Sequence, residues 1–257
     1  AWRCPAGHSF DVAGRGYSNL LPVQRKRSLD PGDSRQMVAA RRRFLAAGHY
    51  EPIADAVART LLAGLPAAAS CLDAGCGEGY YLRRLAAAAR PGQSLAIVGL
   101  DISKWAVLAA AKQDRRPNWV VGSNANLPVL AGTLDRVLCM FGFPVHAEFA
   151  RVLKAGGELV QVDAGPGHLR ELREIIYPRL KPERTAEAPT PAGFRHLGTE
   201  TLGYSCALAG AEQIADLLTM TPHLYRASAE GRAKAAVLTA LTLTVDVRLA
   251  RFARDAA

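Results

Sequence analysis

From residue 69 onward, short apolar runs alternate with stretches whose apolar residues recur at helical spacing. Apolar runs bounded by turn formers predict strands, and the stretches between them predict helices. Regular alternation of the two predicts a parallel sheet wrapped by helices. We expect strands near 69–74, 95–100, 118–122, 134–140 and 157–163, and helices near 80–89, 104–113, 145–153 and 168–177.

The C-terminal part of the chain adds two further strands. Residues 180–194 contain three prolines among mixed charges and predict an exposed loop. A strand near 202–208, a helix near 211–219 and a final alternating strand at 240–249 follow. Together with the earlier runs they predict a seven-stranded sheet that ends in an antiparallel hairpin.

The N-terminal part has a different character. Residues 1–30 are rich in turn formers, and the turn at 31–33 leads into a helix that Asp33 or Ser34 can cap. We expect that helix to end at Gly48 and a second one to run from 52 to 63. The chain is therefore expected to have a small N-terminal module, residues 1–33, and one large domain, residues 34–257.

The most informative motif is the turn that follows the first strand of the large domain. Gly75, Gly77 and Gly79 occupy every second position, between the acids Asp73 and Glu78. A dinucleotide fingerprint has the longer G-x-G-x-x-G spacing, which lets a pyrophosphate rest on the helix N-terminus. Two carboxylates would repel a diphosphate but suit an ammonium group. The motif thus favours S-adenosylmethionine (SAM) over NAD.

Other candidate contacts to SAM follow the next two strands. Asp101 ends the second strand, where an acid commonly accepts hydrogen bonds from both ribose hydroxyls. Ile102 comes directly after it, and Asn124 and Ala125 lie in the loop after the third strand, in a position to contact the adenine edge. The fold class that these features predict is α/β, with the Rossmann-like, seven-stranded sheet of class I methyltransferases.

Composition narrows the class of partner. The formal net charge is +9, and basic clusters fall at Arg25-Lys26 and Arg41-Arg42-Arg43. These five side chains are candidate RNA phosphate contacts, because a basic patch on an enzyme favours a polyanionic partner. The alternative is a solvated arginine-rich face. No apolar run is long enough to span a bilayer, so no membrane partner is expected. The scattered, odd number of cysteines is typical of a cytoplasmic protein.

A family resemblance covers nearly the whole chain. The motifs Cys4-Pro5 to Asp11, Gly16-Tyr17-Ser18-Asn19-Leu20-Leu21, Gly48-His49-Tyr50, Asp73 to Tyr81, Gly165-Pro166-Gly167-His168-Leu169 and Met220-Thr221-Pro222 resemble the ribosomal RNA large subunit guanine-N1 methyltransferases. The N-terminal motifs are specific to that family, whereas many methyltransferases share the glycine motif. The resemblance implies a 23S rRNA substrate, methylation of guanine N1 in a hairpin, and a homodimer. It also implies that Tyr50 and His168 contact SAM.

The same resemblance implies zinc in the N-terminal module. Cys4 and His8 match the second half of the family's ligand pattern, and the first Cys-x-x-Cys pair would lie before Ala1. Two ligands do not complete a tetrahedral site. Either further residues precede Ala1, which the absence of an initial Met favours, or this member binds no zinc.

Candidates for the chemistry itself lie after the fourth and fifth strands. Asp163 and His168 are on the rim where a base could reach guanine N1, although positioning alone can account for catalysis. Phe141 and Phe143 could stack on a flipped guanine or pack in the core. Two other functions stay open: methylation of a small molecule, and non-catalytic RNA binding.

Overall fold

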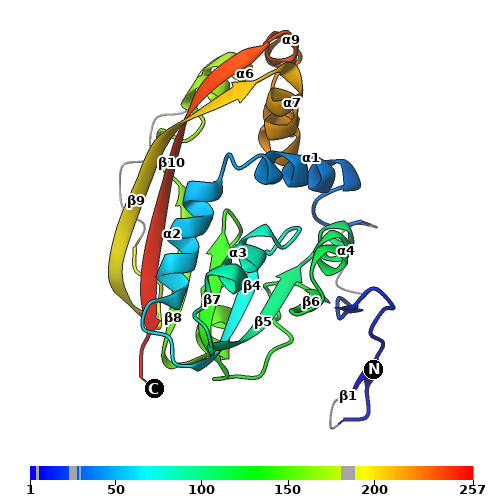
Figure 1. The fold of residues 1–257 in the computed structure, drawn as a ribbon, viewed down its shortest axis with the longest axis vertical. Coiled ribbons are helices and arrows are strands. Elements are labelled where there is room, and N and C mark those ends of the chain that lie inside the picture. Colours follow the sequence, from blue (N-terminus) through cyan, green and yellow to red (C-terminus); the bar gives the residue numbers. More distant parts are fainter. Residues whose placement is uncertain (4–5, 23–27, 29, 181–188, 257) are drawn as a thin grey trace.

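One large sheet forms the centre of the molecule (Figure 1). The computed structural model describes residues 1–3, 6–22, 28, 30–180 and 189–256. Among them, the sheet has eight strands in the order β3-β6-β5-β4-β7-β8-β10-β9. The five predicted parallel strands are confirmed as β4 (Ala68–Ala74), β5 (Ser94–Asp101), β6 (Asn118–Val121), β7 (Leu134–Met140) and β8 (Leu153–Ala164).

The strand order reverses beside β4. From β4 the chain places β5 and β6 on one side and β7 and β8 on the other. In an open α/β sheet the ligand crevice lies outside the carboxyl ends of the strands at such a switch point. The glycine turn after β4 is therefore at the point where a ligand is expected.

The antiparallel hairpin is confirmed but is longer than predicted. It consists of β9 (Phe194–Ala209) and β10 (Ala240–Arg254), and β10 also pairs antiparallel with β8. Because β9 is an edge strand, its first half is mostly exposed and polar. The apolar pattern that marks a strand in the sequence is absent there, which is why the prediction began only at residue 202.

Helices cover both faces of the sheet. Cys71 belongs to one buried cluster and Leu72 to another, as expected of neighbouring strand residues that point to opposite faces. The helices are α1 (Arg35–Ala46), α2 (Glu51–Leu62), α3 (Tyr80–Ala88), α4 (Lys104–Gln113), α5 (His146–Val152), α6 (Arg170–Ile176), α7 (Ala211–Met220), α8 (His223–Arg226) and α9 (Ala229–Ala236). The short helices α8 and α9 have no counterpart in the predictions.

The helix α1 begins as its sequence predicts. Ser34 is the N-cap, and its side chain accepts a hydrogen bond from the backbone N–H of Met37. The buried side chains of α1 include Met37, Val38, Phe44 and Leu45, which form the predicted apolar stripe. The helix lies beside α7 in Figure 1.

The N-terminal residues contribute to the main sheet. A two-stranded sheet joins β1 (Trp2–Arg3) to β2 (Ser9–Phe10), and β3 (Tyr17–Asn19) pairs parallel with β6. This pairing adds an eighth strand to the seven that the pattern predicts. A run of three residues carries too little periodicity to be recognised as a strand, and only pairing with β6 defines it.

Gly79 offers a test of packing under the glycine turn. Its φ is +80°, and a Cβ there would lie 2.5 Å from Cη2 of the buried Trp119. Gly92 has nearly the same φ, +81°, but its Cβ would meet nothing within 4 Å. Gly79→Ala is expected to lower the free energy of unfolding by about 2 kcal/mol more than Gly92→Ala does, because only the first adds overpacking to backbone strain.

Thermal and denaturant unfolding of both variants measure this difference, which corresponds to about 4–8 °C in Tm for a chain of this size. Equal losses in the two variants would show that Trp119 does not limit the space at Gly79.

Candidate active site

The glycine turn is tied to the end of the neighbouring strand. The backbone N–H groups of Gly75 and Cys76 both donate to the carbonyl of Leu100, at 2.8 and 2.9 Å. The Gly77 N–H donates to Oδ2 of Asp101 at 2.9 Å, and the Ser103 N–H donates to Oδ1 at 2.7 Å. Each Asp101 oxygen therefore holds one backbone donor and keeps a lone pair for another. The pKa of the Asp101 carboxyl is raised above its ordinary value, and burial is the largest cause.

Asp73 is a buried carboxylate next to this turn. It is 1% exposed, and Oδ1 has no hydrogen-bond partner among the described residues. Burial, followed by the nearby charge of Asp101, raises the pKa of Asp73 to about 8. A buried oxygen without a partner is costly, so a cationic or hydrogen-bonding ligand at this position would relieve that cost.

Glu78 makes other contacts. Its carboxylate binds Arg83 at 2.9 and 3.1 Å and also accepts from the amide of Gln113. It is 2% exposed. Both oxygens are thus engaged by α3 and α4, and Asp73 is the better placed of the two acids to receive an ammonium group.

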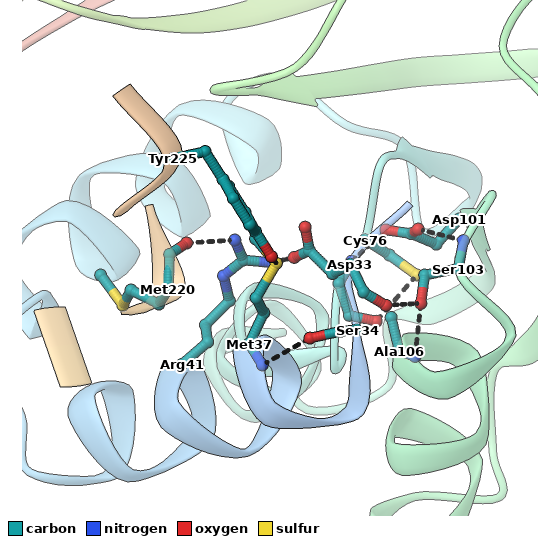
Figure 2. Close-up of polar contacts among 11 residues, drawn as sticks. Asp33, Ser34, Met37, Arg41, Cys76, Asp101, Ser103, Ala106, Met220 and Tyr225 are labelled. Carbon is teal, nitrogen blue, oxygen red and sulfur yellow. Dashed lines mark hydrogen bonds and ion pairs between the residues drawn. The ribbon is translucent and has the colours of Figure 1, made fainter. Parts of the chain in front are cut away.

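Arg41 lies at the glycine turn (Figure 2). Its Nη1 pairs with the carboxylate of Asp33, and its Nη2 donates to the Met220 carbonyl at 2.8 Å. The same Nη1 is 3.6 Å from the point where a Cβ of Gly77 would lie. Arg41 therefore brings a partly buried positive charge to the turn, where it favours the ionised form of Asp101.

The loop before α1 covers the segment after β5. Ser103 Oγ donates to the Asp33 carbonyl at 2.6 Å, as Figure 2 shows. A Cβ on Gly32 would lie 2.8 Å from the side chain of Ile102. These contacts place the start of α1 against Asp101 and Ile102, the predicted ribose and adenine side of the site.

The three consecutive arginines of α1 have different surroundings. Arg42 is exposed, whereas Arg43 pairs with the buried Asp216 of α7. Successive helical residues point about 100° apart, so Arg41 does not share a surface with both of its arginine neighbours. Arg25 and Lys26, the other predicted phosphate contacts, lie outside the described residues.

Tyr50 and His168 are brought together from distant parts of the chain. The Tyr50 hydroxyl is 3.4 Å from Nε2 of His168, and Phe141 stacks on the His168 ring with centroids 5.7 Å apart. Burial lowers the pKa of His168 to about 4, so its ring is neutral at pH 7. Nδ1 accepts from the Asp246 N–H at 3.3 Å, which leaves Nε2–H to donate to Tyr50. Neither ring nitrogen is open to act as a base in this arrangement.

Asp246 on β10 positions His168, and the sequence predictions did not include it. Its carbonyl accepts from Gly165 N–H and its Oδ2 accepts from Gly167 N–H, each at 2.8 Å. A Cβ on Gly165 would lie 2.3 Å from this carboxylate. The one signal in the sequence is an acid placed between two valines of an otherwise apolar and threonine-rich strand, Val245-Asp246-Val247.

The other base candidate, Asp163, is at the carboxyl end of β8. Its Oδ2 accepts from Nε2 of Gln161 at 2.6 Å, and Gln161 Oε1 is 3.0 Å from Nε2 of His146. Asp163 is partly exposed, and its Oδ1 is left without a hydrogen bond from the described residues.

The rim of the site carries apolar side chains. Phe141 is 42% exposed with a φ of 48°, and Phe143 is 89% exposed. The expectation that one of them is a core residue is therefore wrong, because both follow the end of β7 at the surface. Asn124 donates to the Ala74 carbonyl at 3.2 Å, and Ala125 is exposed beside it.

The N-terminal module does not show a metal site in its described part. No group of three or more His, Cys, Asp or Glu side chains that could hold a metal ion occurs within the described residues. Cys4 lies outside them, and His8 alone cannot close a tetrahedral zinc site.

No helix in the described part of the chain is long and apolar enough to cross a membrane.

The sheet order, the glycine turn and the acid ending β5 define the class of protein: an α/β methyltransferase. Two family models agree, "RlmA, N-terminal" over residues 1–29 and "Methyltransferase domain" over residues 71–157. The chain belongs to the 23S rRNA (guanine-N1)-methyltransferase family, because relatives of that family match it over nearly its whole length.

These relatives come from several bacteria. A protein of Micromonospora griseorubida, provisionally named 23S rRNA (guanine-N(1)-)-methyltransferase, is 33% identical over 98% of this chain and 90% of its own. The similarly named YxjB of Bacillus subtilis is 32% identical over 94% of this chain and 86% of its own. The 23S rRNA (guanine(748)-N(1))-methyltransferase of Streptomyces fradiae is 37% identical over 68% of this chain and 61% of its own.

Solved structures support the fold alone. The [4+2]-cyclase SpnF has a TM-score of 0.50 with this chain at 16% identity, over 80% of this chain and 82% of its own. At that identity the likeness says nothing about the reaction.

Proposed function

We propose that this protein transfers a methyl group from SAM to N1 of a guanine in a 23S rRNA hairpin. The observation that carries the proposal is the pair of carboxylates, Asp73 and Asp101, held on either side of the glycine turn in a chain of this family. Each carboxylate can accept further hydrogen bonds. Their separate positions suit the two polar parts of SAM, the ammonium group of its methionine and the hydroxyls of its ribose.

The methionine end of SAM fits the charges beside the turn. Its ammonium group would meet Oδ1 of Asp73, the buried oxygen that lacks a partner among the described residues. Its carboxylate would meet Arg41, whose guanidinium approaches Gly77. Arg41 is thus assigned to the methyl donor SAM rather than to RNA phosphates. This agrees with its contacts to Asp33 and Met220, which hold it at the turn.

The adenosine end fits the segment after β5 and the loop after β6. Asp101 would accept both ribose hydroxyls through the lone pairs that Gly77 and Ser103 leave free. Ile102 is 38% exposed and would lie against the adenine face, while Asn124 and Ala125 would line its edge. Tyr50 and His168 would close the methionine side as neutral hydrogen-bonding groups.

Bound SAM supplies a methyl carbon made electrophilic by its sulfonium. The protein must align guanine N1 with that carbon and keep water away. As the bond from N1 to the methyl carbon forms, the bond between that carbon and sulfur would break, leaving the neutral thioether S-adenosylhomocysteine, and the N1 proton would pass to a base. Asp163 is the better base candidate, because one of its oxygens is open whereas both nitrogens of His168 are bonded. The exposed Phe141 and Phe143 would stack on the guanine.

The test is methylation of unmodified 23S rRNA with SAM carrying a labelled methyl group. Label should enter the RNA, and primer extension should stop at one guanine because N1 methylation blocks Watson–Crick pairing. Label in small molecules only would favour the small-molecule alternative. Tight RNA binding without any transfer of label would favour the non-catalytic alternative. Either result would contradict the proposal.

Three further expectations accompany this function. The protein is expected to work as a homodimer and, since its substrate is ribosomal, in the cytoplasm. Zinc bound through Cys4 and His8 would need two more ligands, so no step of the proposed reaction depends on it. Light scattering of the purified protein measures whether it is a dimer, and metal analysis measures whether it contains zinc.

A further inference from the structure

A second concave surface lies outside the SAM site, between α1 and α4. The groove has a volume of about 600 Å³. Its walls are one face of each helix and one residue of the N-terminal module, and they include Arg15, Arg35, Arg42, Arg43, Trp105 and Lys112. None of these residues takes part in the contacts described for SAM.

The groove is strongly cationic. Five of its lining residues are Arg or Lys and none is an acid. Arg43 is neutralised by Asp216. By contrast, Arg15, Arg42 and Lys112 are exposed, and none of them makes an ion pair within the described residues. A lining with several unpaired cations and no acid is complementary to a polyanion.

One wall is a fixed aromatic platform. Trp105 donates from Nε1 to Oδ2 of Asp30 at 2.6 Å, which sets the plane of the indole. Arg35 lies over the indole, with its Cζ 3.7 Å from the ring centroid. This cation–π contact holds the guanidinium in place while its N–H edge stays available to a ligand. Such a pre-oriented arginine suits phosphate oxygens.

The groove and the glycine turn are both reached by side chains of α1. Helix α1 places Arg42 in the groove and its neighbour Arg41 at the glycine turn. Arg15, which also lines the groove, comes from the N-terminal module. An RNA strand that lies in the groove would therefore touch the N-terminal module and the same helix, α1, that supplies Arg41 to the turn.

We infer that this groove binds the sugar-phosphate backbone of the RNA substrate. Arg15, Arg42 and Lys112 contact phosphates, and Arg35 on its Trp105 platform orients one of them. The identity of the polyanion as RNA rests on the proposed function, whereas the existence of a polyanion site rests on the charges alone. Contacts of this kind supply affinity and orientation rather than sequence choice.

The test is the double variant Arg42→Gln/Lys112→Gln in the full chain, with unmodified 23S rRNA as the probe. Filter binding over a series of salt concentrations gives the Kd and its salt dependence. We expect the Kd at about 0.15 M salt to rise roughly tenfold and the slope of log K against log salt to fall by about two, because each lost phosphate contact removes nearly one unit. The KM for RNA should rise while kcat at saturating RNA stays unchanged.

The matched control is Arg195→Gln/Lys234→Gln. It removes the same charge from β9 and α9, neither of which lines the groove. Its salt slope should equal that of the wild type. A loss equal to that of the groove variant would show that net charge alone matters, and an unchanged slope in the groove variant would likewise overturn the inference.

A wrong assignment of the groove and a wrong proposed function would give different experimental results. If the wild type methylates rRNA but the groove variant binds RNA as the wild type does, only the groove assignment is wrong. If the wild type transfers no methyl group to RNA, yet the groove variant loses RNA affinity and slope, the groove stands and the reaction is wrong. Calorimetry with SAM checks that the groove variant keeps its donor site, and Arg41→Gln should show the opposite pattern, weaker SAM binding with an unchanged salt slope.

Discussion

Replacement of Asp101 by alanine is expected to weaken SAM binding about 100-fold. Two ribose hydroxyls would lose a charged acceptor, and a hydrogen bond to a charged group contributes about 1.5–3 kcal/mol. The sum is about 3 kcal/mol or more, and about 1.4 kcal/mol corresponds to a factor of ten. Calorimetry with SAM measures the change. The expected loss is large because both carboxylate oxygens already have their positions set by Gly77 and Ser103.

The same two backbone contacts create a second explanation for any loss, since removal of the carboxylate also loosens the glycine turn. A 2′-deoxyribose analogue of S-adenosylhomocysteine separates the two. The wild type should prefer the ribose form, and Asp101→Ala should lose that preference. Asp55→Ala is the control, because Asp55 is a surface carboxylate with a 59% exposed side chain that pairs with Arg84. Persistence of the ribose preference in Asp101→Ala would exclude Asp101 as the ribose ligand.

Replacement of Asp73 by asparagine is expected to stabilise the free protein near pH 8 while weakening its affinity for SAM. Burial raises the pKa of Asp73 from 3.8 to about 8 in the folded chain. The folded state therefore binds this proton more tightly than the unfolded state, and the wild type loses stability as pH rises from about 4 through 8. Asparagine never ionises, so the Tm of the variant should fall less than that of the wild type as pH rises from about 4 to 8.

Binding of SAM should also report the protonation state of the Asp73 carboxyl. An ammonium group beside Asp73 favours the ionised form, so SAM binding at pH 7 should release close to one proton. The affinity should rise with pH up to about 8, by at most about tenfold per unit. Calorimetry in two buffers with different ionisation enthalpies measures the released proton. Asp73→Asn should release none, and an equal release from wild type and variant would place the ammonium elsewhere.

Periodicity predicted the central part of the fold well. The runs at 69–74 and 95–100 became β4 and β5 with little change in bounds, because buried strands are apolar along their whole length. The same reasoning missed β3 and the first half of β9. Strands at the edges of a sheet are polar or very short, and they are defined by the neighbour with which they pair.

The predicted site residues divide in the same way. Asp73, the three glycines and Asp101 lie together, since the carboxyl ends of adjacent parallel strands must meet. Glu78 stands in the same motif but binds Arg83 and Gln113. The motif predicts where a side chain is attached to the backbone, and it does not predict which long side chains from other elements will reach it.

By itself, then, the sequence determined the parallel direction of the central strands, the glycine turn after the first of them and the acids beside it, because these depend on local pattern and on strand direction. Only the tertiary structure decided which groups meet there: Asp246 behind His168, Arg41 rather than Arg42 at the turn, and a cationic groove assembled from Arg15, α1 and α4. Those contacts join residues far apart in the chain, and their geometry depends on helix rotation and packing, which no local pattern records.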